Sequence, residues 1–529
     1  MALGERGAIS APHLLAAEAG LDVLKTGGNA VDAAVASAAV SAVVQPFTSS
    51  FAGVGWATVY DRASGTTDVV RFGGFVPALL EPTELPADAH TRLVDWRALE
   101  RTGRSLLGTL VPAAVAGWQS MLARWGTFGL DRALERAQVL AAEGFPVSPL
   151  LAEQLAENAT RLARWSTTAR IFLPHGRPLA AGERLVQSDL GRTIGRIAQH
   201  GADELATGPL ATEIVRFFAD HGGALSADDL AAPAVTWHEP LATRFRDYRV
   251  LATPGALGDV AFVAGLGLLD RCGPFTGPTD PEYIHTSVEV AKLVAAERER
   301  FLGADTTTEV AHWLVSPGHL DELSAHIGPA AEPMHRAAQL RSEDTITLAV
   351  VDRFGNAVHL MQTVGRPFGT GAVIGGTGML ANSSLYFAYV QPGAANRVLP
   401  GRGIEQNPCL ASVFDATGRL VLVIGSPGGK TRVETVRQML ANVIDFHMNP
   451  QQAVDARRFL VSADGSHVEF EERYGPLGPG LDAALAARGH RVRLSREVFG
   501  SGQAIAVDPA TGTRFAAADW RRESIALAY

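Results

Sequence analysis

Strand-forming segments gather at the two ends of this 529-residue chain, while helical periodicity fills most of the stretch between them. An alternating hairpin pattern occupies residues 56–74, and short apolar strand patterns dominate from residue 345 onward. Residues 111–218 and 282–303 instead carry apolar positions at helical spacing. Because distant parts of the chain supply the strands and the middle supplies helices, the pattern predicts an α+β fold with a layered sheet flanked by helices.

The N-terminal segment LLAAEAGLDVLKTGGNAVDAAVASAAVSAVVQP predicts two helices at residues 14–46. The first ends at Gly27-Gly28, and Asn29 caps a second that stops before Pro46. The many alanines and serines of this second helix indicate that it packs closely on a neighbouring element. The apolar run at 33–44 is too short to span a bilayer, and no signal-peptide pattern precedes it. We therefore expect a soluble cytoplasmic protein with no membrane partner.

Composition narrows the function classes. The net charge is −9 and no basic run occurs, so we expect no nucleic-acid partner. Cys272 and Cys409 make no disulfide framework and lack zinc spacing, which favours free thiols in a reducing compartment. The 15 histidines form no His-x3-His or His-Glu-x2-His motif. The sequence therefore predicts neither a metal nor a cofactor.

The stretch SEDTITLAVVD, at residues 342–352, reads as an acidic loop that runs into a strand. One interpretation is a surface loop entering a sheet. The other is that Thr345 is a hidden N-terminus, because a threonine hydroxyl can use its own α-amine as base once the Asp344–Thr345 bond is cleaved. Threonines are common at strand starts, so the spacing alone leaves both readings open.

The stretch VIGSPGGKTR, at residues 423–432, predicts an apolar strand, a glycine-rich turn and a helix. The backbone N–H groups of Gly428 and Gly429 could point at one spot and stabilise an oxyanion. The alternative interpretation is that this segment is an ordinary strand-to-helix turn. The spacing is not that of a Walker A phosphate loop.

Taken together, these segments resemble the γ-glutamyltranspeptidase family over nearly the whole chain. The matching blocks come in the family's order, among them VPAAVAGW at 111–118, LAAEGFPVS at 140–148, the hairpin from residue 345, GSPGGKTR at 425–432 and ADWRRESIALAY at 518–529. The family consists of N-terminal-nucleophile hydrolases with a four-layer αββα sandwich, made as one chain that cleaves itself before a threonine.

The resemblance implies cleavage at Asp344–Thr345, a large subunit of residues 1–344 and a small subunit of residues 345–529, together forming one αββα unit. It implies that Thr345 is the nucleophile and that Thr363 supports it. Gly428 and Gly429 match the oxyanion-hole pair.

The family's glutamate pocket is altered here. The family's carboxylate-binding arginine aligns with Gly73, and Arg71 lies two residues earlier on the same strand face, where it could substitute. Other contact positions also differ from the family pattern, and they are Gly365, Ser384, Phe387, Gln406 and Asn407. Phe387 stands where an aspartate would bind the glutamate ammonium. Losing one partner of such a charged contact costs about 2–5 kcal/mol.

We therefore expect a self-processing threonine hydrolase of a non-glutamyl small molecule. Arg71 or Arg366 would bind a small oxo-acid carboxylate, and Tyr386 and Phe387 would form a more apolar wall. The reaction would be amide hydrolysis, or hydrolysis of a C–C bond that releases an oxalyl group, as in pathways to alkylproline antibiotics. Two alternatives are a true γ-glutamyl hydrolase or transferase and an unprocessed, non-catalytic homologue.

Overall fold

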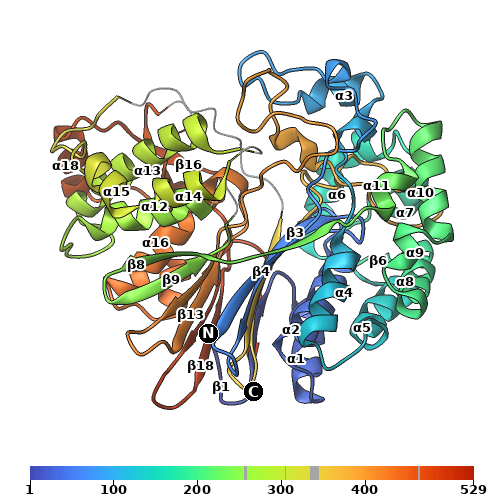
Figure 1. The fold of residues 1–529 in the computed structure, drawn as a ribbon, viewed down its shortest axis with the longest axis horizontal. Helices are drawn as coiled ribbons and strands as arrows, with labels where there is room; N and C mark the ends of the chain where they lie inside the picture. The colour runs from blue at the N-terminus through green and yellow to red at the C-terminus, as the bar shows by residue number, and fades with distance from the viewer. Residues whose placement is uncertain (255–258, 304–305, 334–344, 463–464) are drawn as a thin grey trace.

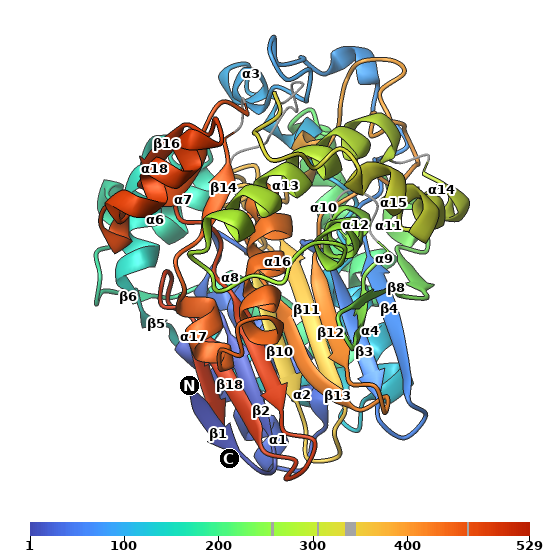
Figure 2. The same cartoon turned by 90° about the vertical axis from the view of Figure 1, so that its left-hand side faces the viewer.

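Two seven-stranded antiparallel sheets face each other at the centre of the molecule, and helices cover the outer face of each (Figures 1 and 2). The computed structural model describes residues 1–254, 259–303, 306–333, 345–462 and 465–529. The layers run helix, sheet, sheet, helix, which confirms the predicted αββα sandwich.

The first sheet carries the predicted nucleophile. In spatial order it contains β19 (Ile525–Ala528), β2 (Ala8–Ala11), β10 (Ile346–Val351), β11 (Ala357–Thr363), β3 (Val54–Asp61), β4 (Thr66–Phe72) and β7 (Val235–His238). Strands from both sides of residue 344 therefore share one hydrogen-bonded sheet.

The second sheet is mixed in the same way. Its order is β1 (Ala2–Gly4), β18 (Arg514–Ala518), β17 (Gln503–Val507), β13 (Leu420–Gly425), β12 (Leu410–Phe414), β9 (Tyr248–Ala252) and β8 (Leu241–Phe245). Two small sheets join β14 (Phe459–Val461), β15 (Val468–Glu471) and β16 (Val492–Ser495), and β5 (Phe145–Pro146) and β6 (Arg184–Leu185).

Helices form the outer layers (Figure 1). Those on the side of the first sheet are α1 (Leu14–Lys25), α2 (Ala30–Val44), α4 (Ala114–Trp125), α5 (Leu130–Glu143), α6 (Pro149–Leu162), α7 (Ser166–Phe172), α8 (Ser188–His200), α9 (Asp203–Ala206), α10 (Pro209–Asp220) and α11 (Ala227–Ala231). Those on the side of the second are α12 (Asp259–Asp270), α13 (Pro281–Phe301), α14 (Thr308–Leu314), α15 (Pro317–Ser324), α16 (Arg432–Ile444), α17 (Pro450–Asp455) and α18 (Pro479–Ala487).

Helix α2 shows how the sequence builds the layer behind β10, the strand that follows the predicted nucleophile. The Asn29 side chain accepts hydrogen bonds from the backbone N–H groups of Val31 and Asp32, and the Asn29 N–H donates to the Asp32 carboxylate. All fifteen residues of the helix are buried, and nearly all are Ala, Val or Ser. Small side chains let α2 lie close against β10 and β11. The predicted capped helix is confirmed.

A separate lobe sits above the open end of the two sheets, where α3 (Trp96–Arg101) lies beside the loop that follows residue 384 (Figure 1). Its apolar cluster joins Val76, Leu99 and Leu110 from one segment to Leu385 and Ile404 from the other. The two chain ends meet at the opposite end of the molecule, where the Tyr529 N–H donates to the Gly7 carbonyl at 3.0 Å. The lobe thus covers the sheet end at which β10 begins.

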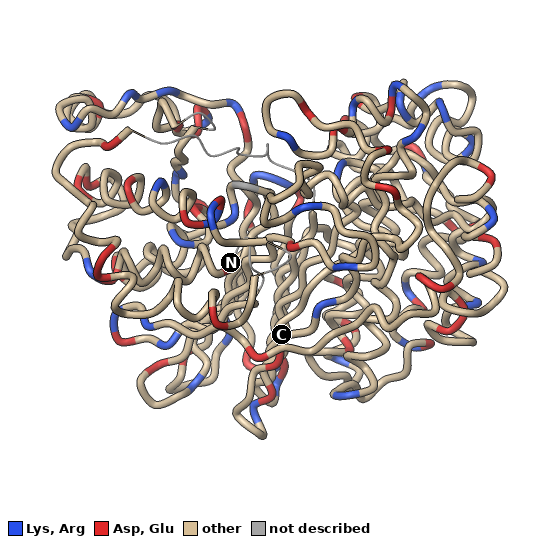
Figure 3. The backbone as a smooth tube through the Cα atoms, turned by 45° about the horizontal axis from the view of Figure 1, so that its top comes forward, with Lys and Arg blue, Asp and Glu red and all other residues tan. Residues whose placement is uncertain are grey.

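The surface carries both charge signs, and Figure 3 shows acidic and basic residues interspersed along the backbone. None of the helices in the described ranges combines the length and the apolar character needed to cross a bilayer. Asp344 lies outside the described residues. The subunit boundary at Asp344–Thr345 therefore stays a prediction.

Candidate active site

Thr345 lies directly before β10, a central strand of the first sheet. The whole residue is only 4% exposed. Its hydroxyl donates to the Thr363 hydroxyl over 3.3 Å, and the Gly365 N–H donates to the same Thr363 oxygen at 2.9 Å. The first distance is long for an O–H···O bond. The structure thus brings the predicted nucleophile and its predicted support together.

Arg432 also contacts the predicted nucleophile, a contact that the sequence analysis did not predict. Its Nη2 donates to Thr345 Oγ1 at 2.6 Å, and its Nη1 donates to the backbone carbonyl of Asn407. The residue begins α16 and is 2% exposed. The signal was present in the sequence, because Arg432 closes the GSPGGKTR block where a helix starts beside the glycine turn.

The glycine turn has a conformation that requires its glycines. Gly428 has φ 127° and Gly429 has φ 52°, both in the region that side chains disfavour. A Cβ on Gly428 would lie 2.6 Å from Thr431 Oγ1 and 2.9 Å from the Gly500 Cα. Asn407 Nδ2 donates to the Gly429 carbonyl at 2.8 Å and fixes the turn. Within the described residues, neither the Gly428 nor the Gly429 N–H donates to a protein acceptor.

Four of the predicted substrate-binding residues carry a buried polar atom without a partner among the described residues. These atoms are Ser384 Oγ, Tyr386 Oη, Gln406 Nε2 and Asn407 Oδ1. A buried polar atom left unpaired costs about 1–3 kcal/mol, so protein cores rarely keep several together. Polar groups of this kind are the ones that a bound substrate or water would satisfy.

Gly365, one of the predicted substrate-binding residues, has no room for a side chain. Its φ is 92°, and an added Cβ would lie 2.9 Å from the Ser383 carbonyl carbon and 3.0 Å from the Ser384 nitrogen. Backbone atoms cannot withdraw as a flexible side-chain tip can. The segment that carries Ser384 therefore occupies the space of a side chain at residue 365.

Both predicted carboxylate-binding arginines already hold a protein carboxylate. Arg71 pairs with Glu405 at 3.3 Å and donates to the Ile404 carbonyl at 2.8 Å. Arg366 pairs with Glu100 at 2.9 Å, and its guanidinium carbon lies 3.0 Å from the centre of the Trp96 ring. A substrate carboxylate at either guanidinium would have to compete with that glutamate.

The predicted aromatic wall takes two different environments. Tyr386 is buried, whereas Phe387 is half-buried and packs against the apolar cluster of the upper lobe. Their ring centres are 4.1 Å apart. Tyr386 thus carries a buried hydroxyl, and Phe387 contributes packing to the lobe.

Two buried titratable groups, Asp259 and His359, have shifted pKa values. Burial raises the pKa of Asp259 to about 7, against hydrogen bonds from the backbone N–H groups of Cys409 and Leu410. Arg432 interacts electrostatically with the same carboxyl. Burial lowers the pKa of His359, on β11, to about 3. The His359 ring fills the space beside Gly425, where a Cβ would lie 2.3 Å from its Cε1.

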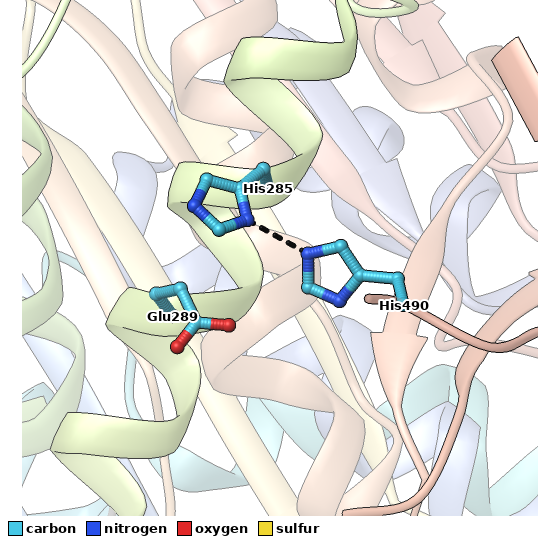
Figure 4. A group of neighbouring side chains, drawn as sticks. All are labelled: His285, Glu289 and His490. Atoms are coloured by element: carbon cyan, nitrogen blue, oxygen red, sulfur yellow. Dashed lines mark hydrogen bonds between the residues drawn. The ribbon is translucent and has the colours of Figure 1, made fainter. Parts of the chain in front are cut away.

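One group of potential metal ligands lies elsewhere, between α13 and the segment before β16 (Figure 4). His285 Nδ1 and His490 Nε2 are hydrogen-bonded to each other at 2.8 Å, and His285 Nε2 meets the Gly328 carbonyl at 2.8 Å. Glu289 accepts from the Lys292 ammonium at 2.7 Å. Because the ligand atoms already have partners and a cation sits on the carboxylate, we interpret the group as a polar packing contact.

A threonine at the start of a central strand, inside an αββα sandwich, is the arrangement of the N-terminal-nucleophile hydrolase class. A comparison with family sequence models agrees with this class. The model described as gamma-glutamyltranspeptidase matches residues 16–529, so the chain belongs to the γ-glutamyltranspeptidase family.

Relatives of the chain are named for different activities. The acylase ACY 1 proenzyme of Pseudomonas sp. (strain SE83) is 33% identical over 100% of this chain and 94% of its own length. The glutathione hydrolase proenzyme of Escherichia coli (strain K12) is 29% identical over 98% of this chain and 90% of its own length. Among solved structures, the cephalosporin acylase from Bacillus halodurans superposes with a TM-score of 0.88 at 26% identity, over 100% of this chain and 96% of that one.

Proposed function

We propose that this chain is a precursor that cleaves itself at Asp344–Thr345 and then hydrolyses a non-glutamyl acyl substrate with Thr345 as the nucleophile. The observation that carries the proposal is the placement of the Thr345 hydroxyl, which contacts both Thr363 and Arg432 at the open end of the first sheet. Membership of a family with proenzyme relatives supports it.

Self-cleavage would begin with attack of Thr345 Oγ1 on the Asp344 carbonyl carbon. The C–N bond breaks as the acyl group moves from nitrogen to oxygen, and the hydroxyl proton ends on the released amine. Water then hydrolyses the ester, which frees an Asp344 carboxylate and the Thr345 α-amine. The products would be residues 1–344 and 345–529, and they would stay together because strands from both halves share each sheet.

Substrate turnover would reuse the same hydroxyl with the new amine as base. The α-amine takes the proton of Thr345 Oγ1 as the oxygen attacks the substrate carbonyl. We propose that the Gly428 and Gly429 N–H groups would receive the oxyanion. Their lack of a protein acceptor within the described residues supports this role. The protonated amine then gives its proton to the leaving amine, and water hydrolyses the threonine ester.

We propose an amide with a polar acyl group as the substrate. Gly73, Gly365, Ser384 and Phe387 stand where the family places contacts to a glutamyl group, and Phe387 offers no charge to an α-ammonium. Ser384, Tyr386, Gln406 and Asn407 supply buried neutral polar atoms instead. Similarity to acylases by sequence and by structure favours the amide over hydrolysis of a C–C bond that releases an oxalyl group. We propose a cytoplasmic location, where Cys272 and Cys409 would remain reduced.

A substrate panel tests this proposal against its alternatives. Purified protein is offered an N-acylated cephalosporin amine, an oxalyl-bearing compound and γ-glutamyl-p-nitroanilide, with Thr345→Ala as the inactive control. We expect two bands on a denaturing gel and hydrolysis of the acyl amide with at most weak γ-glutamyl turnover. Preferred γ-glutamyl turnover would establish a true γ-glutamyl hydrolase, and preferred oxalyl release would establish the C–C reaction. A single 55.8 kDa band with no turnover would instead support the third alternative, an unprocessed, non-catalytic homologue.

A further inference from the structure

Arg432 brings a positive charge to the atom that has to react. Its Nη2 lies 2.6 Å from Thr345 Oγ1, and both residues are almost fully buried, at 2% and 4% exposure. Because Arg432 donates this hydrogen bond, Oγ1 accepts it and directs its own hydrogen to Thr363. A guanidinium retains its charge throughout the working pH range of enzymes, so this contact persists at every such pH.

The same charge reaches the group that would act as base. Oγ1 and the nitrogen of one threonine are about 3 Å apart in common rotamers, which places the guanidinium about 3–6 Å from the α-amine released by self-cleavage. A cation at this distance disfavours the ammonium form of the amine. An ordinary α-amino group has a pKa of about 7.7–8.0, so without this effect most of the base would be protonated at neutral pH.

We propose that Arg432 is a catalytic residue that polarises the Thr345 hydroxyl for self-cleavage and keeps the Thr345 α-amine uncharged at neutral pH in the processed enzyme. This inference rests on the proposed function, since it requires Thr345 to be the nucleophile. It extends that function by assigning the residue that prepares both the nucleophile and its base.

Other titratable groups interact with Arg432 and have to be separated from the amine. Asp259 and Cys409 both interact electrostatically with the guanidinium, and burial raises the pKa of each. The pKa of Asp259 is about 7, so its titration falls in the same range as that of the amine. The Cys409 pKa lies well above its ordinary value, so this thiol stays neutral. Asp259 is therefore the group to control for.

The experiment compares the acid limb of the kcat/KM profile in the wild type, Arg432→Gln and Arg432→Lys. Glutamine removes the charge, so the acid limb should move up by about one to two pH units. Lysine keeps the charge, so the limb should stay near the wild-type position. Asp259→Asn removes the second titration, and the shift caused by Arg432→Gln should persist in the Asp259→Asn background.

The rate of precursor cleavage gives a second readout. Loss of a charge-assisted hydrogen bond to the attacking oxygen should slow self-cleavage in Arg432→Gln about 10- to 100-fold. If the Gln variant does not fold, Arg432→Met serves as the uncharged variant of similar length. A wild-type acid limb together with wild-type cleavage in a folded uncharged variant would overturn the inference, as would equal shifts in the Lys and Gln variants.

The outcomes also separate this inference from the proposed function. If the wild-type protein is not cleaved before Thr345, the assignment of Thr345 as the nucleophile is wrong, and so is the proposed function. A wild type that is cleaved there, with uncharged variants that titrate and cleave as it does, would remove only the role of Arg432.

Discussion

Replacing Gly428 by alanine should abolish most turnover while leaving the fold in place. The residue has φ 127°, and the added Cβ would lie 2.6 Å from Thr431 Oγ1 and 2.9 Å from the Gly500 Cα. The hydroxyl can rotate away, but the Cα belongs to the backbone, so the turn itself has to shift. Backbone strain of this kind costs about 1–3 kcal/mol, which a protein of this size tolerates.

The catalytic loss should be larger than the loss of stability. Displacing one oxyanion donor lowers kcat about 10²–10³-fold, which corresponds to about 2.7–4 kcal/mol of transition-state stabilisation. The matched control is Gly418→Ala, in the turn between β12 and β13. Gly418 has φ 80°, and an added Cβ would meet nothing within 4 Å. This control bears backbone strain far from Thr345.

The assay measures kcat, KM and the melting temperature of both processed variants. We expect Tm to fall in both and kcat to fall at least about 100-fold only in Gly428→Ala. A folded, processed Gly428→Ala enzyme with kcat within a few-fold of the wild type would refute the oxyanion role of this turn. An equal kcat loss in Gly418→Ala would show that strain alone explains the effect.

Three further predictions concern self-cleavage, stability and the arginine pairs. Thr345→Ala should remain a single chain on a denaturing gel, since no hydroxyl is left to attack Asp344; appearance of two subunits would contradict this. His359 is neutral in the fold, with a pKa of about 3, and binds a proton near pH 6.5 when unfolded. The unfolded state therefore binds more protons between these values, and stability should fall as pH drops through this window. In His359→Leu, denaturant titrations should show a pH dependence weaker by up to about 5 kcal/mol, and an unchanged slope would contradict the assignment. Arg71→Ala and Arg366→Ala should lower stability because they leave Glu405 and Glu100 without these partners; a raised KM at unchanged Tm would instead assign either arginine to the substrate.

The layered fold was predictable because its main signals are local. The capped helix before Pro46, the hairpin of β3 and β4 and the strand pair from residue 346 all follow from caps, turn residues and alternation. The strand order was not predictable from such patterns. β2 joins the first sheet between β19 and β10, partners more than 300 residues away in sequence, and local periodicity contains no information on such pairing.

The candidate site, like the fold, could be predicted only in part from the sequence. Block order placed Thr345, Thr363 and the glycine pair, and the structure brings the two threonines together. The contact of Arg432 with Thr345 depends on the direction in which α16 continues from the glycine turn. The amino-acid sequence alone does not specify this direction. The ion pairs Arg71–Glu405 and Arg366–Glu100 could not be predicted from the sequence either, because each joins segments hundreds of residues apart. Tertiary ion pairs decide whether an arginine near a site can serve the substrate.

The identity of the small-subunit N-terminus tests the proposed nucleophile most directly. Purified wild-type protein is analysed by intact mass and by N-terminal sequencing of each band. We predict two chains, and a smaller chain whose sequence begins Thr-Ile-Thr-Leu, from Thr345. A smaller chain that begins at any other residue, or a folded chain that stays intact at 55.8 kDa, would contradict the assignment of Thr345.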